Sequence, residues 1–211
     1  MKPLRWQIEK FETPEFCQDM IQRAESIGFE KATITTPGGP VLRIEYRHND
    51  RVIFDDWDLA AKLFQKIKDD PRLHNPGWEC IGLNERFKIY RYSGPDQYFA
   101  SHYDGSFERI PFVEQSWVTM LVYLNEDFEG GQTSFIDGEI EPKTGLAAFV
   151  TQHNYLHEAR EAVDGAKYVL RTDVMYRKIE ELQEKRTLTV LTDEEMGKKV
   201  LLEVLKQHII G

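Results

Sequence analysis

Apolar residues in the first part of the chain recur at helical spacing in two places. In the first, Thr13-Pro14-Glu15 supplies an N-cap residue, a proline at the first helical position and an acid in the first turn, directly before FCQDMIQRAESIGF. We expect a helix from about 14 to 28, ended by Gly28. The second place, LAAKLFQKI, predicts a helix within residues 57–67 that ends before Pro71.

Beyond residue 80 the pattern changes to short apolar runs rich in β-branched and aromatic residues. Clusters of Gly, Pro, Asn and Asp separate these runs, which is typical of the strands of a sandwich or a barrel. The runs are ERFKIYRY (85–92), SWVTMLVYL (116–124), GQTSFI (131–136), LAAFVT (146–151) and AKYVLRTDVMY (166–176), with an earlier candidate strand from Val41 to Tyr46.

The last segment returns to helical spacing. From Thr192 to Ile209 the chain has a capping residue, acids in the first turn and one apolar face, which predicts an amphipathic helix. No repeat or linker divides the chain. We therefore predict a single domain over 1–211, mainly β with flanking helices (α+β): a helical part at about 1–80, a β core at about 83–177 and a helical tail at about 190–210.

Composition narrows the class of protein. The 211 residues include 36 acids and 27 Lys or Arg, a formal charge of −9, which opposes binding to nucleic acid or anionic lipid. No apolar run approaches the roughly 18 residues that span a bilayer, and charges come too early for a secretory signal. Cys17 and Cys80 are too few for a disulfide framework. We expect a globular cytoplasmic protein without nucleic-acid or membrane partners.

Candidate metal ligands lie in YSGPDQYFASHYDGSF. His102 and Asp104 are one residue apart, so on an extended strand both side chains point to the same face. The pair alone is also compatible with a solvated turn. A third ligand is expected from His157 in NYLHEARE, after the LAAFVT strand, whereas His153 lacks the LHE context. Two histidines and one carboxylate form the facial triad of non-haem Fe(II) oxygenases.

The order and spacing of five segments from Leu83 to Tyr176 are more specific: NERFKIYRYSGPDQYFASHYD, TMLVYLNEDFEGGQTSF, PKTGLAAF, LHE and GAKYVLRTDVMY. Here the chain resembles the prolyl 4-hydroxylase-like 2-oxoglutarate/Fe(II)-dependent dioxygenases. The resemblance implies a double-stranded β-helix (jelly roll or cupin-like) core that holds Fe(II) through His102, Asp104 and His157. It also implies O₂ and 2-oxoglutarate as cosubstrates, with ascorbate as a further candidate cofactor. Decarboxylation to succinate and CO₂ would be coupled to hydroxylation of an unactivated C–H bond.

A buried 2-oxoglutarate carboxylate needs a cation, because an unpaired charge in a protein core costs several kcal/mol. Lys167, ten residues after His157, matches the position at which the resembling enzymes place this cation; the alternative is a surface lysine on a strand. Arg171 shares the face of Lys167 by the period of two and is the competing anchor. The resemblance adds contacts from Tyr123 and Tyr92, and Thr119 lies on the same strand face as Tyr123. All three are otherwise read as half-buried strand residues.

The substrate is less defined than the chemistry. The resemblance favours a prolyl or other residue in a peptide or protein, with a free amino acid or small molecule as alternatives. The charged loop Arg47–Arg51 is either a solvated cluster or a source of substrate contacts. A non-catalytic metal-binding module and a Zn hydrolase use the same ligand set. Neither alternative explains Lys167 in its GAKY context.

Overall fold

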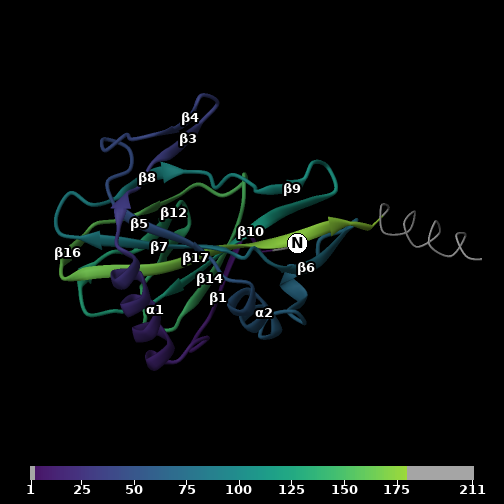
Figure 1. Cartoon of the computed structure of the whole chain (residues 1–211), viewed down its shortest axis with the longest axis horizontal. Coiled ribbons are helices and arrows are strands. Elements are labelled where there is room, and N and C mark those ends of the chain that lie inside the picture. The colour runs from purple at the N-terminus through teal and green to yellow at the C-terminus, as the bar shows by residue number, and fades with distance from the viewer. Residues whose placement is uncertain (1–2, 180–211) are drawn as a thin grey trace, which may run out of the picture.

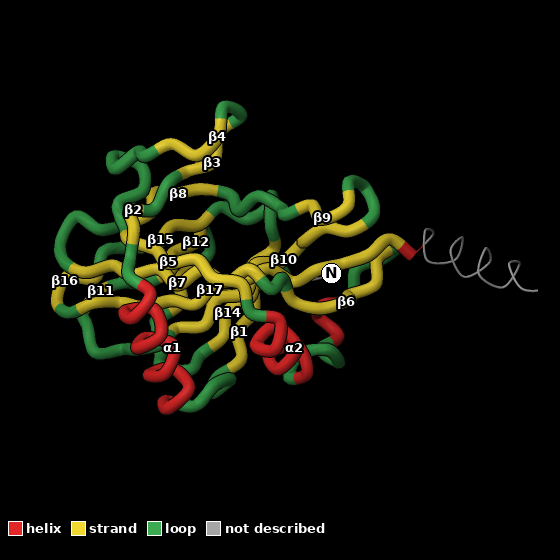
Figure 2. Tube along the Cα trace, in the orientation of Figure 1, coloured by secondary structure: helices red, strands yellow, loops and turns green. Residues whose placement is uncertain are grey.

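The computed structural model describes residues 3–179 and consists mostly of antiparallel strands in two principal sheets, with two α-helices (Figure 1). The helices cover one face of the larger sheet, and the smaller sheet faces the other (Figure 2). This arrangement confirms the predicted class, a mainly β fold with a double-stranded β-helix core and flanking N-terminal helices. The predicted tail helix, 192–209, lies outside the described residues.

The larger sheet has nine strands in the order β1-β14-β10-β17-β7-β5-β2, with β6 added beside β17 and β9 beside β10. Its centre is formed by β10 and β17, which pair antiparallel from Glu114 with Arg177 to Tyr123 with Val169. The strands are β1 (Arg5–Ile8), β2 (Glu30–Lys31), β5 (Asp50–Asp55), β6 (Trp78–Leu83), β7 (Arg86–Ser93), β9 (Glu108–Ile110), β10 (Glu114–Tyr123), β14 (Ala147–Thr151) and β17 (Ala166–Lys178).

The smaller sheet has four strands in the order β13-β12-β15-β8, and two two-stranded ribbons complete the fold. The strands of the smaller sheet are β8 (Phe99–His102), β12 (Thr133–Phe135), β13 (Gly138–Ile140) and β15 (His157–Ala159). The ribbons pair β3 (Ile34–Thr36) with β4 (Gly39–Val41), and β11 (Glu129–Gly130) with β16 (Ala162–Asp164).

Both helices begin where the sequence places a capping side chain. Helix α1 (Pro14–Ile27) starts after Thr13, whose hydroxyl accepts a hydrogen bond from the Phe16 amide, and ends at Gly28 with φ +90°. Helix α2 (Trp57–Gln65) starts after Asp56, whose carboxylate accepts from the Leu59 amide. Neither helix, nor the short 3₁₀ turn Pro71–Leu73, is long and apolar enough to cross a membrane; this holds for the described residues.

Alternation along the central strands divides the core in two. On β17, Leu170, Val174 and Tyr176 belong to the cluster that includes buried residues of both helices. Val169 belongs instead to the cluster between the two sheets, and Lys167 points to the same side. Because strand side chains alternate, a shift of one residue would exchange the two sets, so burial on both faces defines the register.

The structure departs from the predicted elements at three points. The strand expected from Val41 to Tyr46 is wrong beyond Val41, because residues 42–46 form a turn in which the Arg43 carbonyl accepts hydrogen bonds from the Tyr46 and Arg47 amides. The second helix stops at Gln65, and the backbone then tightens into a turn. Strands β1, β5 and β6 were not expected; β5 includes the last two residues of the Arg47–Arg51 loop.

Candidate metal centre and cosubstrate cavity

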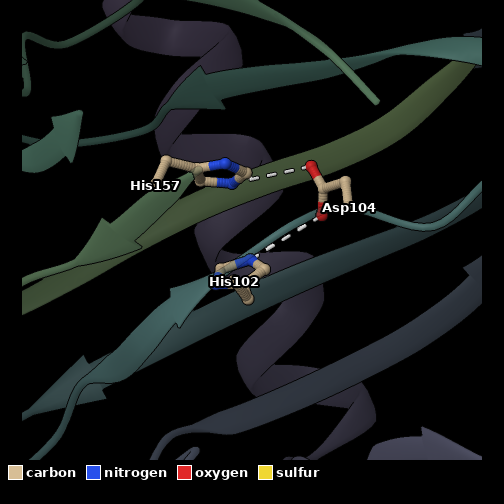
Figure 3. Close-up of side chains that lie close together, drawn as sticks. All are labelled: His102, Asp104 and His157. Carbon is tan, nitrogen blue, oxygen red and sulfur yellow. Dashed lines mark ion pairs between the residues drawn. The ribbon is translucent and has the colours of Figure 1, made fainter. Parts of the chain in front are cut away.

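The three candidate metal ligands converge between the two sheets. His102 ends β8 and His157 begins β15, and the two residues are directly paired across these strands. Asp104 lies between the rings: Oδ1 is 3.8 Å from His102 Nε2, and Oδ2 is 3.6 Å from His157 Nε2 (Figure 3). One ligand atom from each residue lies within 4.8 Å of the others. His153 is outside this group; its Nε2 accepts a hydrogen bond from the Ser106 amide.

Asp104 does not lie on an extended strand with His102, in contrast to the expectation from the sequence. Strand β8 ends at His102, so Asp104 follows the strand and does not share a strand face with the histidine. The backbone carbonyl of Asp104 accepts a hydrogen bond from the His153 amide at 2.9 Å. Its carboxylate pairs with Arg171 Nη2 at 3.3 Å. These two contacts, and not the strand period, place the carboxylate.

Hydrogen bonds and charge prepare both imidazoles for a metal. His102 Nδ1 lies 2.8 Å from the Ala100 carbonyl, and His157 Nδ1 lies 3.0 Å from the Tyr155 carbonyl. Since a carbonyl only accepts, each Nδ1 carries the hydrogen and each Nε2 keeps its lone pair toward Asp104. Burial, with His157 nearby, lowers the pKa of His102 to about 4, so its ring is neutral at pH 7.

Asp104 is an anion in this environment. Burial raises the pKa of its carboxyl, but Arg171 and the two histidines outweigh burial and hold the pKa well below its usual range. Arg171 also pairs with Asp173 at 3.2 Å, and Gln152 donates to Asp173 at 2.9 Å. Arg171, the alternative anchor for 2-oxoglutarate, is therefore occupied by two carboxylates and orients the ligand group.

Lys167 is a buried cation without an anionic partner. The side chain is 1% exposed and its Nζ donates to the Gly131 carbonyl at 2.5 Å. The rings of Tyr92 and Tyr123 lie 5.2 and 5.5 Å away, and no carboxylate within residues 3–179 pairs with it. Burial lowers the pKa of Lys167 to about 7. A charge in this position becomes favourable when an anion enters beside it.

Of the remaining residues that were predicted to contact 2-oxoglutarate, only some line the cavity. Tyr92 lines the same cavity as Lys167, whereas Tyr123 does not; its hydroxyl lies 2.7 Å from the Thr133 hydroxyl, and Thr133 lines the cavity in its place. Thr119 lies behind the ligand group, where its hydroxyl is 3.3 Å from Arg171 Nη2 and 3.2 Å from Gln152 Nε2.

Thr133 and Gly131 were missed as site residues. Gly131 has a φ of +71°, a backbone conformation that favours glycine. A Cβ at Gly131 would lie 3.1 Å from Lys167 Cδ and 2.7 Å from the Phe128 ring, so the close approach also requires glycine. The sequence feature that could have identified Thr133 as a site residue is the run of polar residues after the Gly-Gly turn.

These groups share one cavity of about 830 Å³ between the sheets. The metal-ligand group and Lys167 both line it, together with the apolar side chains of Leu121 and Val169. The volume is that of a small-molecule site rather than of a packing defect. The arrangement places a candidate metal position and the buried Lys167 in the same cavity.

Comparison with known proteins agrees with this geometry. Residues 87–172 match the model of the 2OG-Fe(II) oxygenase superfamily. No curated protein matches the chain. Among solved structures, the viral collagen prolyl hydroxylase of Paramecium bursaria Chlorella virus-1, in its 2OG complex, is 19% identical with a TM-score of 0.57, covering 83% of this chain and 97% of its own.

Two further prolyl hydroxylases have the same fold. The prolyl-4-hydroxylase of Pseudomonas putida is 17% identical over 83% of this chain and 93% of its own, with a TM-score of 0.60. The enzyme of Trichoplax adhaerens, solved with a hypoxia-inducible-factor peptide fragment, is 16% identical over 84% and 85%, with a TM-score of 0.62.

The family match over residues 87–172 agrees with the predicted resemblance to the 2-oxoglutarate/Fe(II)-dependent dioxygenases. The solved prolyl hydroxylases share the fold of this chain.

Proposed function

We propose that this dioxygenase holds Fe(II) through His102, Asp104 and His157 and anchors the far carboxylate of 2-oxoglutarate on Lys167. The observation that carries the proposal is the convergence of the three ligand atoms within 4.8 Å, in a cavity that also contains a buried, unpaired lysine. The reaction is hydroxylation of an unactivated C–H bond. The first candidate substrate is a prolyl residue in a peptide, because the structural neighbours are prolyl hydroxylases and one was solved with a peptide.

With Fe(II) bound, O₂ would be the oxidant and 2-oxoglutarate would be oxidised with the substrate: the C–H compound, 2-oxoglutarate and O₂ would give the alcohol, succinate and CO₂. The chain's own residues position the reactants. Both histidines have a carbonyl at Nδ1 and direct Nε2 toward Asp104, and Arg171 keeps Asp104 ionised and turned toward them. Lys167 supplies the counter-charge for the cosubstrate, and Leu121 and Val169 exclude water beside it.

The two alternative functions are less well supported. A metal-binding module or a Zn hydrolase would use the same three ligands, but neither needs a buried ammonium in the same cavity. The position of Lys167 beside Gly131 and between two tyrosine rings is expected for an enzyme that receives a dicarboxylate.

The ligand assignment predicts a spectroscopic signal. Metal-free protein mixed anaerobically with Fe(II) and 2-oxoglutarate should develop the visible charge-transfer band of the chelate, and admission of air should yield succinate. Zn(II) in place of Fe(II) is the control and should give no band. A protein that binds Fe(II) without developing the band on addition of 2-oxoglutarate would contradict the proposed function.

The buried position of Lys167 predicts that 2-oxoglutarate binding depends on pH. The pKa of Lys167 is about 7 in the free protein, so the ammonium is present below pH 7 and must be regained for binding above it. We expect the dissociation constant, followed by the chelate band from pH 6 to 9, to rise above pH 7 by up to about tenfold per unit.

The Lys167→Arg variant is the matched control, because arginine remains protonated across this range. Tyr90, with a pKa of about 8, also titrates in this window, but it is present in both proteins. Tyr92 and Tyr123 stay neutral because burial raises the pKa of each phenol. The difference between the two curves therefore reports Lys167, and superimposable curves would refute the assignment.

A further inference from the structure

The wall of the cavity carries more positive charge than the cosubstrate requires. Six cationic side chains line it, against two carboxylates, although the whole chain has a formal charge of −9. A recess lined mainly by one sign of charge concentrates ligands of the opposite sign. The cations are Arg47, Arg51, Arg86, Lys88, Lys167 and Arg171; the carboxylates are Asp104 and Asp173.

Arg47 is buried beside the metal ligands and has an unused donor. Its backbone forms an antiparallel bridge with Phe99, whose ring stacks on His102 at 3.6 Å. The guanidinium lies over the rings of Phe99 and Tyr90, at 4.3 and 4.7 Å. Nε donates to the Asn49 side chain and Nη1 to the Thr33 carbonyl. The buried Nη2 has no hydrogen-bond partner within the described residues, and Arg47 as a whole residue is only 7% exposed.

Lys88 is a second cation without an ion pair in the described part of the chain. It shares a face of β7 with Tyr90 and lies directly opposite Arg171 on β17. Asp173 is the carboxylate nearest in register, and it is already paired with Arg171 at 3.2 Å. Repulsion between Lys88 and Arg171 is therefore only partly offset, which leaves a position for an added anion.

The ionisation of Tyr90 reports the same excess of charge. Burial raises the pKa of this phenol, but Arg171, Arg47 and Lys88 together outweigh burial and lower the pKa to about 8. Three cations thus surround one neutral hydroxyl. The cluster of Arg47, Lys88 and Tyr90 has the features of an anion-binding site, because its hydrogen-bond donors are held in place and are partly shielded from water.

One molecule of 2-oxoglutarate is too short to place one carboxylate at Lys167 and the other at Lys88. Lys167 pairs in register with Tyr92, four residues along β7 from Lys88. Four residues of a strand rise about 13 Å. The two carboxyl carbons of a five-carbon diacid, joined by four C–C bonds of about 1.5 Å, are only about 5 Å apart. The cations at the Lys88 end are left for a different ligand.

We propose that Arg47 and Lys88 form a second anion subsite that receives a carboxylate of the substrate. This inference rests on the proposed function, since it places the subsite beside the metal centre of the same cavity. Arg47 offers its unpartnered Nη2 and Lys88 its ammonium, which suits a singly charged carboxylate. Two other cations of the wall have partners: Arg51, opposite Tyr90 in register, is paired with Glu30 at 3.0 Å, and Arg86 is opposite Asp55 in register.

Matched probes that differ only in charge test the subsite. The anaerobic Fe(II)–2-oxoglutarate protein is titrated calorimetrically with three pairs: proline and prolinamide, N-acetyl-Gly-Pro-Gly as acid and as amide, and N-acetyl-Gly-Pro-Glu amide and its Gln counterpart. In at least one pair, the member with the added carboxylate should bind at least tenfold more tightly. The pair that discriminates identifies the source as a free amino acid, a peptide terminus or an acidic side chain.

Substitutions show which residues cause the preference for the probe with the added carboxylate. Lys88→Gln should reduce it to about twofold or less, and Arg47→Gln provides the second test of the same subsite. Lys68→Gln, an exposed lysine outside the cavity, is the matched control and should keep the full preference. Equal binding within all three pairs, or a preference unchanged in both subsite variants, would overturn the proposal.

The two proposals fail in different ways. If the parent protein gives no chelate band, the proposed function is wrong, and carboxylate binding to the metal-free protein still tests the subsite. If Lys88→Gln weakens 2-oxoglutarate binding, measured by the band, by as much as it weakens the probe, then the cations serve the cosubstrate and the substrate subsite is refuted.

Discussion

Asp104→Ala is expected to reduce 2-oxoglutarate turnover by at least about a hundredfold. Loss of a residue that merely orients a metal ligand costs 10–100-fold in metal affinity or activity, so loss of the ligand itself should cost more. Asp104 also supplies the only negative charge among the three candidate ligands. Removing it leaves two imidazoles and no anionic ligand, and this set should bind Fe(II) weakly. Succinate formation in air and Fe(II) binding under anaerobic conditions are the two measurements.

The control separates loss of the ligand from loss of the fold. Asp19→Ala makes the same substitution on the exposed side of α1 and should leave turnover unchanged. Circular dichroism should be the same for both variants, because Arg171 retains its pair with Asp173 when Asp104 is absent. An Asp104→Ala protein that keeps full turnover would show that the carboxylate ligand has been assigned wrongly.

Lys167→Met should abolish tight 2-oxoglutarate binding while stabilising the free protein. Removing one partner of a buried ion pair costs about 3–5 kcal/mol, which is a loss of roughly a hundredfold to several thousandfold in affinity. In the free protein the ammonium has no anionic partner in the described residues, and burial lowers its pKa to about 7. Replacing it by an apolar chain of similar length removes that cost, so the unfolding temperature should rise.

These opposite effects give the test two independent readouts. The chelate band measures 2-oxoglutarate affinity, and thermal unfolding of the metal-free protein measures stability. Lys68→Met is the matched control, since Lys68 is exposed, and it should change neither. A Lys167→Met protein with normal 2-oxoglutarate affinity would transfer the anchoring role to another cation, with Arg171 the first to examine.

Much of the fold could be predicted because local signals agree with the tertiary structure. The predicted cap Thr13 begins α1, the second helical pattern contains α2, and each of the five apolar runs of the core overlaps an observed strand. The strands that were missed have less regular patterns. Strand β5, for example, begins with Asp50 and Arg51, which are read as a charged loop until their pairing with β7 is known.

The candidate site was predictable to the extent that its residues follow strand periods and fixed spacings. Lys167 and Arg171 line the same cavity, as the period of two requires. The structure distinguishes them through contacts made between strands, since Arg171 meets Asp104 and Lys167 meets Gly131. Such contacts join residues far apart in the chain and are invisible to a local pattern.

Arg47 shows why the remainder could not be predicted. In the sequence it opens a run of charged and polar residues that is typical of solvated loops. In the fold, the side chain is covered by two aromatic rings from β7 and β8. Aromatic faces compensate part of the cost of desolvating the guanidinium. This burial depends on how two sheets face each other, which residue order alone does not reveal.

The division of β17 and β7 between two faces has a practical consequence for protein engineering. Cavity-facing positions other than Lys167, Arg171 and Asp173 can be randomised in a directed-evolution library while the positions facing α1 and α2 remain constant. The layer that supports the helices is then untouched by the library, and sites without shared contacts contribute to stability almost independently. Altered selectivity is thus accessible from few codons, with little loss of correctly folded clones.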